Sequence, residues 1–318
     1  MPLESKALIL AKIETTYGVD ASPTVSADAI LTTKPTIELI EENKDREVVL
    51  PYFGSLVAIP VATGIKIGFS VEFRGSGTPT TPPRIGTLLR ACRYTQTTEA
   101  DAVRYDPNSS QDGESITIYF YHDGILYKAL GCLGSSLKLA TKTNEIAKLD
   151  FEFTGMFDGN ASLASAVAFP TPTFGDAAVP PIFRSSSFSF GGLSAANAII
   201  DALEITHTNT VVKRSDANAT YGVKRYSFTA REISGSFDPE VVGLGTWNPW
   251  SVYETPTLGA LSATIGNTAG NRCKISAPNC QIEAPKLGAR DGIQTYSIAF
   301  KPRVTLTSGN DEIRFRFN

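Results

Sequence analysis

The sequence predicts a mainly β protein, made of two tandem β-sandwich or β-barrel domains with one short α-helix in the first domain. Three observations lead to this prediction. Apolar and polar residues alternate in many short segments, which is the pattern of strands with one buried face. Turn-forming residues are abundant, with 26 glycines and 19 prolines. A series of strand-like segments in the first half of the chain recurs in the second half.

Length and composition support a folded core. The 318 residues suffice for two domains of ordinary size or for one large β domain. Hydrophobic residues make up 42% of the chain and charged residues only 19%, which is not the composition of a disordered protein. We expect four segments, which are an N-terminal arm at 1–30, a first domain at 31–158, a linker at 159–182 and a second domain at 183–318.

The arm and the linker differ from the domains in their patterns. Residues 1–30 show no clear periodicity, so we expect an extended conformation. Residues 159–182 are dominated by proline and alanine, which favours a semi-extended connection over a regular element.

The first domain contains a regular series of strand signals. The strongest is at 65–74, where apolar and polar residues alternate without interruption. Asp123-Gly124 predicts a tight hairpin turn, because glycine tolerates the positive φ that such turns require. Further strands are expected at 116–120, 125–130, 137–139 and 149–153.

One helix is expected between these strands. Four residues have the i, i+3, i+4, i+7 spacing of a single apolar helix face, namely Ile85, Leu88, Leu89 and Cys92. Two prolines at 82–83 come before them, and proline is well tolerated in the first turn of a helix.

The second half repeats the order of these signals. Two pairs of segments match at an offset of 166 (203 − 37), which are 37–39 with 203–205 and 65–67 with 231–233. Two later pairs match at about 147 (296 − 149), which are the turns at 123–124 and 269–270 and the final strands at 149–153 and 296–300. The second copy is therefore shorter, and the loss falls within 75–111, which includes the helix. The alternative is that any two β domains share such alternation.

The sequence has no pattern of catalytic, cofactor-binding or metal-binding residues. His122 and His207 are the only histidines, and neither has a serine or cysteine nucleophile at a recognisable spacing. Phosphate-binding and calcium-binding loop patterns are missing as well. No CxxC pair and no nearby histidine accompany the cysteines, so free buried thiols are expected at Cys92, Cys132, Cys273 and Cys280. We therefore expect no enzyme, no cofactor and no metal.

Charge and hydropathy exclude two further classes of protein. The net charge of −3, from 29 basic and 32 acidic residues, argues against a basic face that clamps nucleic acid. No stretch approaches the ~20 apolar residues that cross a bilayer. A secretory signal is not evident either. We expect a protein made in a reducing cytosol, without contact to a membrane.

A long segment separates the first two strand signals, at 41–60. It mixes charged with apolar residues and is too long for a tight hairpin, and loops of this length inside compact domains are usually functional. Aromatic residues and arginine dominate the energetics of protein interfaces. We therefore expect this loop to contact another subunit, with Arg46, Tyr52 and Phe53 as its anchors.

An aromatic cluster at 247–253 contains Trp247, Trp250 and Tyr253. A packed cap over the second domain is expected, because tryptophan mostly contributes buried area. The alternative is a platform for a sugar, which would make the chain a β-sandwich adhesin or a carbohydrate-binding fibre module. A β-rich hydrolase is a further alternative, and it would need clustered acidic residues.

Six motifs in the first half resemble those of one known family. They are AKIETTYGVD at 11–20, REVVLPYFG at 46–54, FSVEFRGSGT at 69–78, LLRAC at 88–92, SITIYF at 115–120 with Asp123-Gly124, and FEFTG at 151–155. In this order they are similar to the opening segment, first long loop, strand, helix, hairpin and closing strand of the major tail tube proteins of long, non-contractile-tailed bacteriophages. The resemblance covers about residues 7–158 and extends to the second half only through the repeat.

The resemblance implies a structural virion protein of the phage tail, assembled in the host cytoplasm. Tail-tube-type domains would join into a closed β-barrel ring, and stacked rings would form the tube that conducts DNA into the host. The implied partners are further copies of the chain, the tape measure protein, the tail terminator and tip proteins, and double-stranded DNA that passes without specific binding.

Two expectations combine the resemblance with the repeat. If one chain supplies two tube domains, a sixfold ring becomes a homotrimer with pseudo-sixfold symmetry. The alternative is a homohexamer in which residues 183–318 decorate the outside. A bore that passes DNA should be neutral or acidic. Glu72, Asp150 and Glu152 lie on the polar sides of predicted strands and are candidates to face it, with the outer surface as the alternative.

Overall fold

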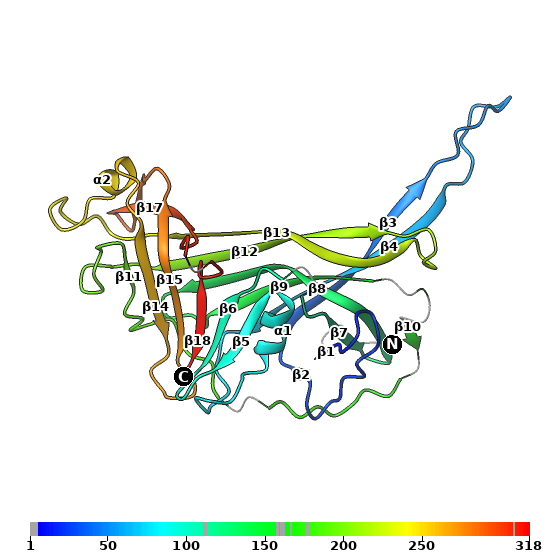
Figure 1. The fold of residues 1–318 in the computed structure, drawn as a ribbon, viewed down its shortest axis with the longest axis horizontal. Coiled ribbons are helices and arrows are strands. Elements are labelled where there is room, and N and C mark those ends of the chain that lie inside the picture. The colour runs from blue at the N-terminus through cyan, green and yellow to red at the C-terminus, as the bar shows by residue number, and fades with distance from the viewer. Residues whose placement is uncertain are drawn as a thin grey trace.

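The computed structural model describes residues 6–110, 113–156, 159, 163–165, 167–175, 178–307 and 309–318. These residues form a mainly β molecule with two short helices (Figure 1). The strands are β1 (Ala7–Ile13), β2 (Ala29–Ile30), β3 (Thr33–Lys44), β4 (Ile59–Glu72), β5 (Tyr94–Thr98), β6 (Val103–Pro107), β7 (Ile116–His122), β8 (Ile125–Lys142), β9 (Lys148–Met156), β10 (Leu163–Ser165), β11 (Ser189–Phe190), β12 (Ala202–Ser215), β13 (Val223–Phe237), β14 (Gly259–Ile265), β15 (Cys273–Ile282), β16 (Lys286–Arg290), β17 (Ile293–Pro302) and β18 (Arg314–Phe317). The helices are α1 (Ile85–Ala91) and α2 (Pro249–Glu254).

One antiparallel sheet, here called the long sheet, runs through both halves of the chain. Its strand order is β3–β4–β9–β8–β12–β13–β17–β16. The two halves meet where β8 pairs with β12, with Leu139 opposite Ile205. The sheet is not closed, because β3 and β16 each pair with a single strand among the described residues.

A second layer packs against one face of the long sheet. In the first half it contains β2, β1 and β7 in that order, and β7 pairs with the first part of β8. In the second half β11, β14, β15 and β18 follow one another, and β18 pairs with β6 of the β5–β6 hairpin. The two halves are therefore joined in both layers.

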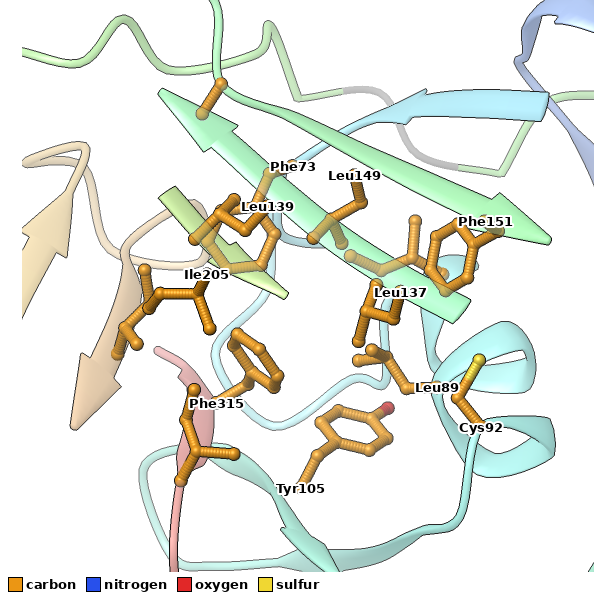
Figure 2. Packing of buried hydrophobic residues seen from close by; sticks show 14 of the residues in the cluster. Phe73, Leu89, Cys92, Tyr105, Leu137, Leu139, Leu149, Phe151, Ile205 and Phe315 are labelled. Atoms are coloured by element: carbon orange, nitrogen blue, oxygen red, sulfur yellow. The ribbon is translucent and has the colours of Figure 1, made fainter. Parts of the chain in front are cut away.

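The core lies between these layers. Leu139, Leu149 and Ile205 project from the long sheet and meet Tyr105 and Phe315 of the second layer (Figure 2). The apolar face of α1 is buried there, as its spacing predicted. The largest hydrophobic cluster contains residues from both halves, so they share one core. The expected segment boundaries at 158 and 183 stay predictions.

The same order of elements occurs twice along the chain. Apart from the β5–β6 hairpin and β16, a hairpin, a helix, a second hairpin and a final strand come in the same order in both halves, as β3–β4, α1, β7–β8 and β9 in the first and as β12–β13, α2, β14–β15 and β17 in the second. Ile67 lies opposite Phe153, and Gly235 lies opposite Phe300. If the final strands match at 147 (300 − 153), these pairings relate the first hairpins by 168 (235 − 67). The sequence match at 166 differs by two residues, because a pattern with a period of two fits both offsets.

The prediction that only the first half contains a helix is wrong. α2 follows β13 just as α1 follows β4. It has only six residues, too few to show a helical period in the sequence. Its start is defined by Asn248, whose side chain accepts hydrogen bonds from the backbone N–H groups of Trp250 and Ser251, and by Pro249 in its first turn.

Two further expectations need correction. The segments 125–130 and 137–139 are parts of one 18-residue strand, β8, which follows a bulged path from the second layer into the long sheet. The expected extended arm contains β1, which pairs with β7 along its whole length and is mostly buried. A strand covered on both faces shows no alternation, so its apolar run gave no period-two signal.

Candidate assembly interface

The β3–β4 hairpin extends beyond the body of the molecule (Figure 1). Residues 45–58, here called the projecting loop, connect its two strands. The three predicted anchors lie together on this loop, and all are exposed, with Tyr52 at 80% and Phe53 at 113% of their reference areas and Arg46 exposed as well. Val48, Val49 and Val57 on the loop are also exposed. An uncovered set of large apolar side chains is typical of an interaction surface.

Charged contacts connect the loop end of this hairpin to its counterpart in the second half. Glu42 on β3 accepts hydrogen bonds from Lys213 Nζ at 2.7 Å and from Lys44 Nζ at 2.9 Å. The bond from Lys213, followed by that from Lys44, lowers the pKa of Glu42 to about 2. Because Lys213 belongs to β12, the contact links the first hairpin of each half.

One face of the long sheet turns away from the core and is here called the open face. Glu72, Asp150 and Glu152, the predicted bore residues, all lie on it, because each alternates with buried apolar neighbours. Glu152 Oε1 accepts a hydrogen bond from Ser135 Oγ at 3.0 Å and lies 3.7 Å from Lys66 Nζ. The structure thus brings the three carboxylates to one polar surface.

Acidic and basic side chains are interspersed on the open face. Lys138 Nζ lies 2.7 Å from Glu204 Oε1 across the junction of β8 and β12. Lys301 Nζ lies 2.8 Å from Glu232 Oε1 between β17 and β13. Serine and threonine side chains of β12 and β13 line a hollow of about 410 Å³ between these pairs. The open face therefore presents paired charges and short polar groups rather than a basic stripe.

The long sheet ends at two edges that face no further strand of the described chain. β3 forms one edge, and Leu39 on it is 53% exposed. β16 forms the other, and Leu287 on it is 60% exposed. Edges with free backbone groups and exposed apolar side chains are sites where another strand can add.

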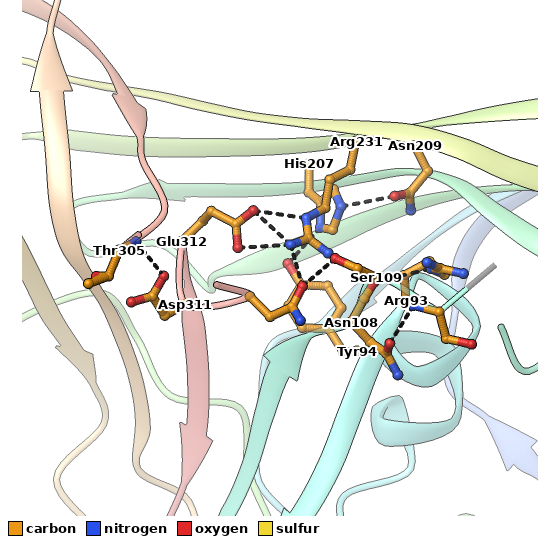
Figure 3. A network of polar contacts seen from close by, with 12 residues as sticks. Arg93, Tyr94, Asn108, Ser109, His207, Asn209, Arg231, Thr305, Asp311 and Glu312 are labelled. Carbon is orange, nitrogen blue, oxygen red and sulfur yellow. Dashed lines mark hydrogen bonds and ion pairs between the residues drawn. The ribbon is translucent and has the colours of Figure 1, made fainter. Parts of the chain in front are cut away.

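A buried polar network connects the two halves (Figure 3). Tyr94 Oη lies 2.7 Å from His207 Nδ1, and His207 Nε2 lies 3.1 Å from Asn209 Oδ1. Arg231 pairs with Glu312 at 2.7 Å. Burial lowers the pKa of His207 to about 4, so its imidazole is neutral at pH 7. The members satisfy one another's polar groups, and we interpret the network as structural.

The aromatic cluster at 247–253 is divided. Trp247 is buried, and its Nε1 donates a hydrogen bond to the Gly191 carbonyl at 3.1 Å. Trp250 and Tyr253 are partly exposed on α2, at 43% and 48%. Trp247 packs as expected, and the three rings do not form one platform.

Metal sites, membrane-spanning helices and reactive thiols can each be assessed in the part of the chain that the structure describes. There, no three His, Cys, Asp or Glu side chains lie close enough together to hold a metal ion. None of the helices in the described ranges has the length and apolar character needed to span a bilayer. The cysteines are free and buried as predicted, and burial raises the pKa of all four thiols.

Sequence reasoning missed the two free edges and the polar network. Both depend on residues far apart in the chain, such as Tyr94 with His207 and β8 with β12. The sequence contains one signal for the network, His207, and a single histidine does not indicate which distant residues it contacts.

A comparison with known families matches almost the whole chain. The model of one family, described as phage tail tube protein, matches residues 4–302 and so includes both halves. No curated protein matches the sequence. The mainly β fold and the resemblance of the first half agree with this match. The chain therefore belongs to the phage tail tube protein family.

Proposed function

We propose that this structural protein of the phage virion tail forms a ring of three chains with pseudo-sixfold symmetry, and that stacked rings conduct double-stranded DNA into the host. One observation carries the proposal. Two sets of four strands, β3–β4–β9–β8 and β12–β13–β17–β16, lie side by side in one sheet and are joined where β8 pairs with β12. A chain that occupies two equivalent positions completes a sixfold ring with three copies.

The dimensions support a ring that encloses DNA. Each chain contributes the eight strands of the long sheet. Three chains give about 24 strands, and at ~4.8 Å spacing and roughly 40° tilt the backbone diameter is about 48 Å. This width leaves space for a duplex after side chains are added. Closing the ring also covers both free edges of the long sheet, as in any barrel.

In this proposal the open face lines the bore. Glu72, Asp150 and Glu152 then face the DNA together with the lysines that pair with neighbouring carboxylates. Tight binding of a duplex requires many cationic groups that neutralise phosphates. Interspersed charges and short polar side chains support passage without specific binding.

The tape measure protein before ejection, and the terminator and tip proteins at the tube ends, would be further partners of tubes assembled in the host cytoplasm.

The projecting loop connects consecutive rings in this proposal. Arg46, Tyr52 and Phe53 would bury their side chains in the neighbouring ring, because large apolar groups gain free energy when removed from water. The loop has the reach for such a contact because β3 and β4 carry it beyond the body.

Cryo-EM of assembled tubes tests the proposal. We expect three chains per ring, both halves around the bore and the open face inside. Six complete chains per ring with residues 183–318 remote from the bore would establish the homohexamer instead. A map with all three carboxylates on the outer surface would overturn the assignment of the bore.

A further inference from the structure

We propose that β16 of one copy pairs with β3 of the partner subunit, in the register that β8 and β12 use within the chain. This inference rests on the proposed ring and specifies its joint between chains. The junction of β8 with β12 serves as the template, because it already connects the last strand of one half to the first strand of the next. The positions of the new contact follow from the strand pairings.

The β16 side of the joint is located through the final strands. Lys138 on β8 lies opposite Asp150 on β9. Ser297 on β17 corresponds to Asp150 at the offset of 147 (297 − 150), and Lys286 lies opposite Ser297. Lys286 therefore takes the place of Lys138. By the same relation Leu287, opposite Tyr296, takes the place of Leu139, opposite Leu149.

The β3 side is located through the first hairpins. Ile205 lies opposite Gly235, and Ile37 lies opposite Ile67. Because Gly235 and Ile67 are equivalent, Ile37 takes the place of Ile205 at the offset of 168 (205 − 37). The next residue, Glu38, takes the place of Thr206.

The template then gives the pairs of the new joint. Leu139 lies opposite Ile205, and Lys138 lies opposite Thr206. Leu287 should therefore lie opposite Ile37 of the partner subunit, on the core side of the sheet. Lys286 should lie opposite Glu38 of the partner subunit, on the open face.

Charge and burial both support this joint. The template contains an ion pair between strands, with Lys138 Nζ 2.7 Å from Glu204 Oε1, and the new joint sets Lys286 against a carboxylate on the same face. Opposite charges across a strand pair are favourable, and like charges are not. Leu139 and Ile205 are 1% and 2% exposed inside the template, whereas Leu287 is 60% exposed at its free edge. Pairing with a second copy would cover this side chain in the same way.

Two prolines keep the joint short. Pro285 comes directly before β16, next to Lys286. Pro35 lies within β3, two residues before Ile37, and so at the opposite end of the joint. Neither residue has a backbone N–H to donate, so edge pairing is limited near both. The free edges are thereby protected from random strand addition before assembly. Because fewer backbone hydrogen bonds can form, the charge pair and the apolar pair between the prolines contribute more to the choice of partner.

Charge reversal tests the joint on full-length protein. Glu38→Lys and Lys286→Glu should each raise the concentration needed for tube formation about tenfold, since like charges would then meet in every joint. The double variant, made together with Lys66→Gln because Glu38 also lies opposite Lys66 within the chain, restores opposite charges in the joint and should return close to the original concentration. Thr208→Lys, on the same face but away from both edges and opposite Glu232, adds a positive charge without a like-charge contact across its strand pair; it is the control and should assemble normally.

Cysteine cross-linking provides a second readout. The variant Glu38→Cys/Lys286→Cys should form disulfides between chains on mild oxidation of assembled tubes, with closed three-chain products. The native cysteines are buried and do not compete. Glu232→Cys/Lys286→Cys should not cross-link chains.

The outcomes separate this inference from the proposed function. Tubes of trimeric rings in which Glu38→Cys/Lys286→Cys forms no disulfides between chains, or a double charge reversal that remains defective, would overturn the joint while the ring stands. Wild-type protein that forms no ring would overturn the function itself.

Discussion

The first hairpins of the two halves hold equivalent positions, yet they end differently. β3 and β4 are connected by the 14 residues 45–58, which carry exposed valine, tyrosine and phenylalanine side chains. β12 and β13 are connected by the seven residues 216–222, which are mostly polar and close on themselves through Asp216, whose side chain accepts a hydrogen bond from the Asn218 N–H. The same pair of strands thus carries a long loop with exposed apolar side chains in one half and a short turn in the other. A ring of three chains would then present projecting loops at alternate positions only.

Replacement of the projecting loop should have the largest effect on tube assembly. Replacing the projecting loop with an Asn-Gly turn should leave a folded, soluble subunit that no longer forms tubes of normal spacing, because the apolar contacts between rings are removed. The same replacement of residues 216–222 is the matched control and should preserve tubes. Negative-stain microscopy with circular dichroism reads out both. Normal tubes from the first variant would show that the loop is not the stacking contact.

A second difference lies in how the hairpins are anchored. β13 contributes Arg231, whose pair with Glu312 is largely buried, whereas Lys66 of β4 pairs with Glu152 in an exposed position. Arg231→Ala should lower the free energy of unfolding by about 3 kcal/mol, because it leaves a buried carboxylate without its partner. Lys66→Ala should change it by less than about 1 kcal/mol. Urea unfolding measures both, and equal effects would contradict the contrast.

The stability of the protein should also vary with pH, through a histidine on the first hairpin of the second half. His207 occupies the position that Leu39 has in the first (207 − 168 = 39). The unfolded chain protonates histidine near pH 6.5, while the folded pKa is about 4, so stability present above pH 6.5 is lost as the pH falls towards 4. The loss should approach roughly 3 kcal/mol. His207→Gln should remove this component and His122→Gln should not, and an unchanged profile in the former would refute the assignment.

The smallest of the expected effects concerns the contact between the two first hairpins, which is made by Glu42 and Lys213. Lys213→Ala removes the stronger hydrogen bond to Glu42, so the pKa of Glu42 should rise from about 2 towards its ordinary value. Lys44→Ala should raise it less. Carboxylate titration by NMR distinguishes the two, and an equal rise in both variants would contradict the dominant role of Lys213.

Local patterns allowed much of the fold to be predicted. The alternation at 65–74 and the spacing of Ile85, Leu88 and Leu89 correctly indicated β4 and α1, because both reflect which side chains face the core. The projecting loop was predicted from its length and from its mixture of charged and aromatic residues. The positions of β3 and β16 at the two edges of the long sheet could not be predicted, because they depend on the pairing of β8 with β12 and so on the whole topology. β1 escaped detection because both of its faces are buried.

The covalent link between the halves has a kinetic consequence. Residues 143–201 tether β8 to β12, so this junction forms at an effective concentration set by the tether and not by the amount of protein in solution. In a ring of three chains, half of the joints would then form during folding of the single chain. Only the remaining joints would depend on diffusion and on protein concentration, which lowers the number of chains that must associate to close a ring from six to three.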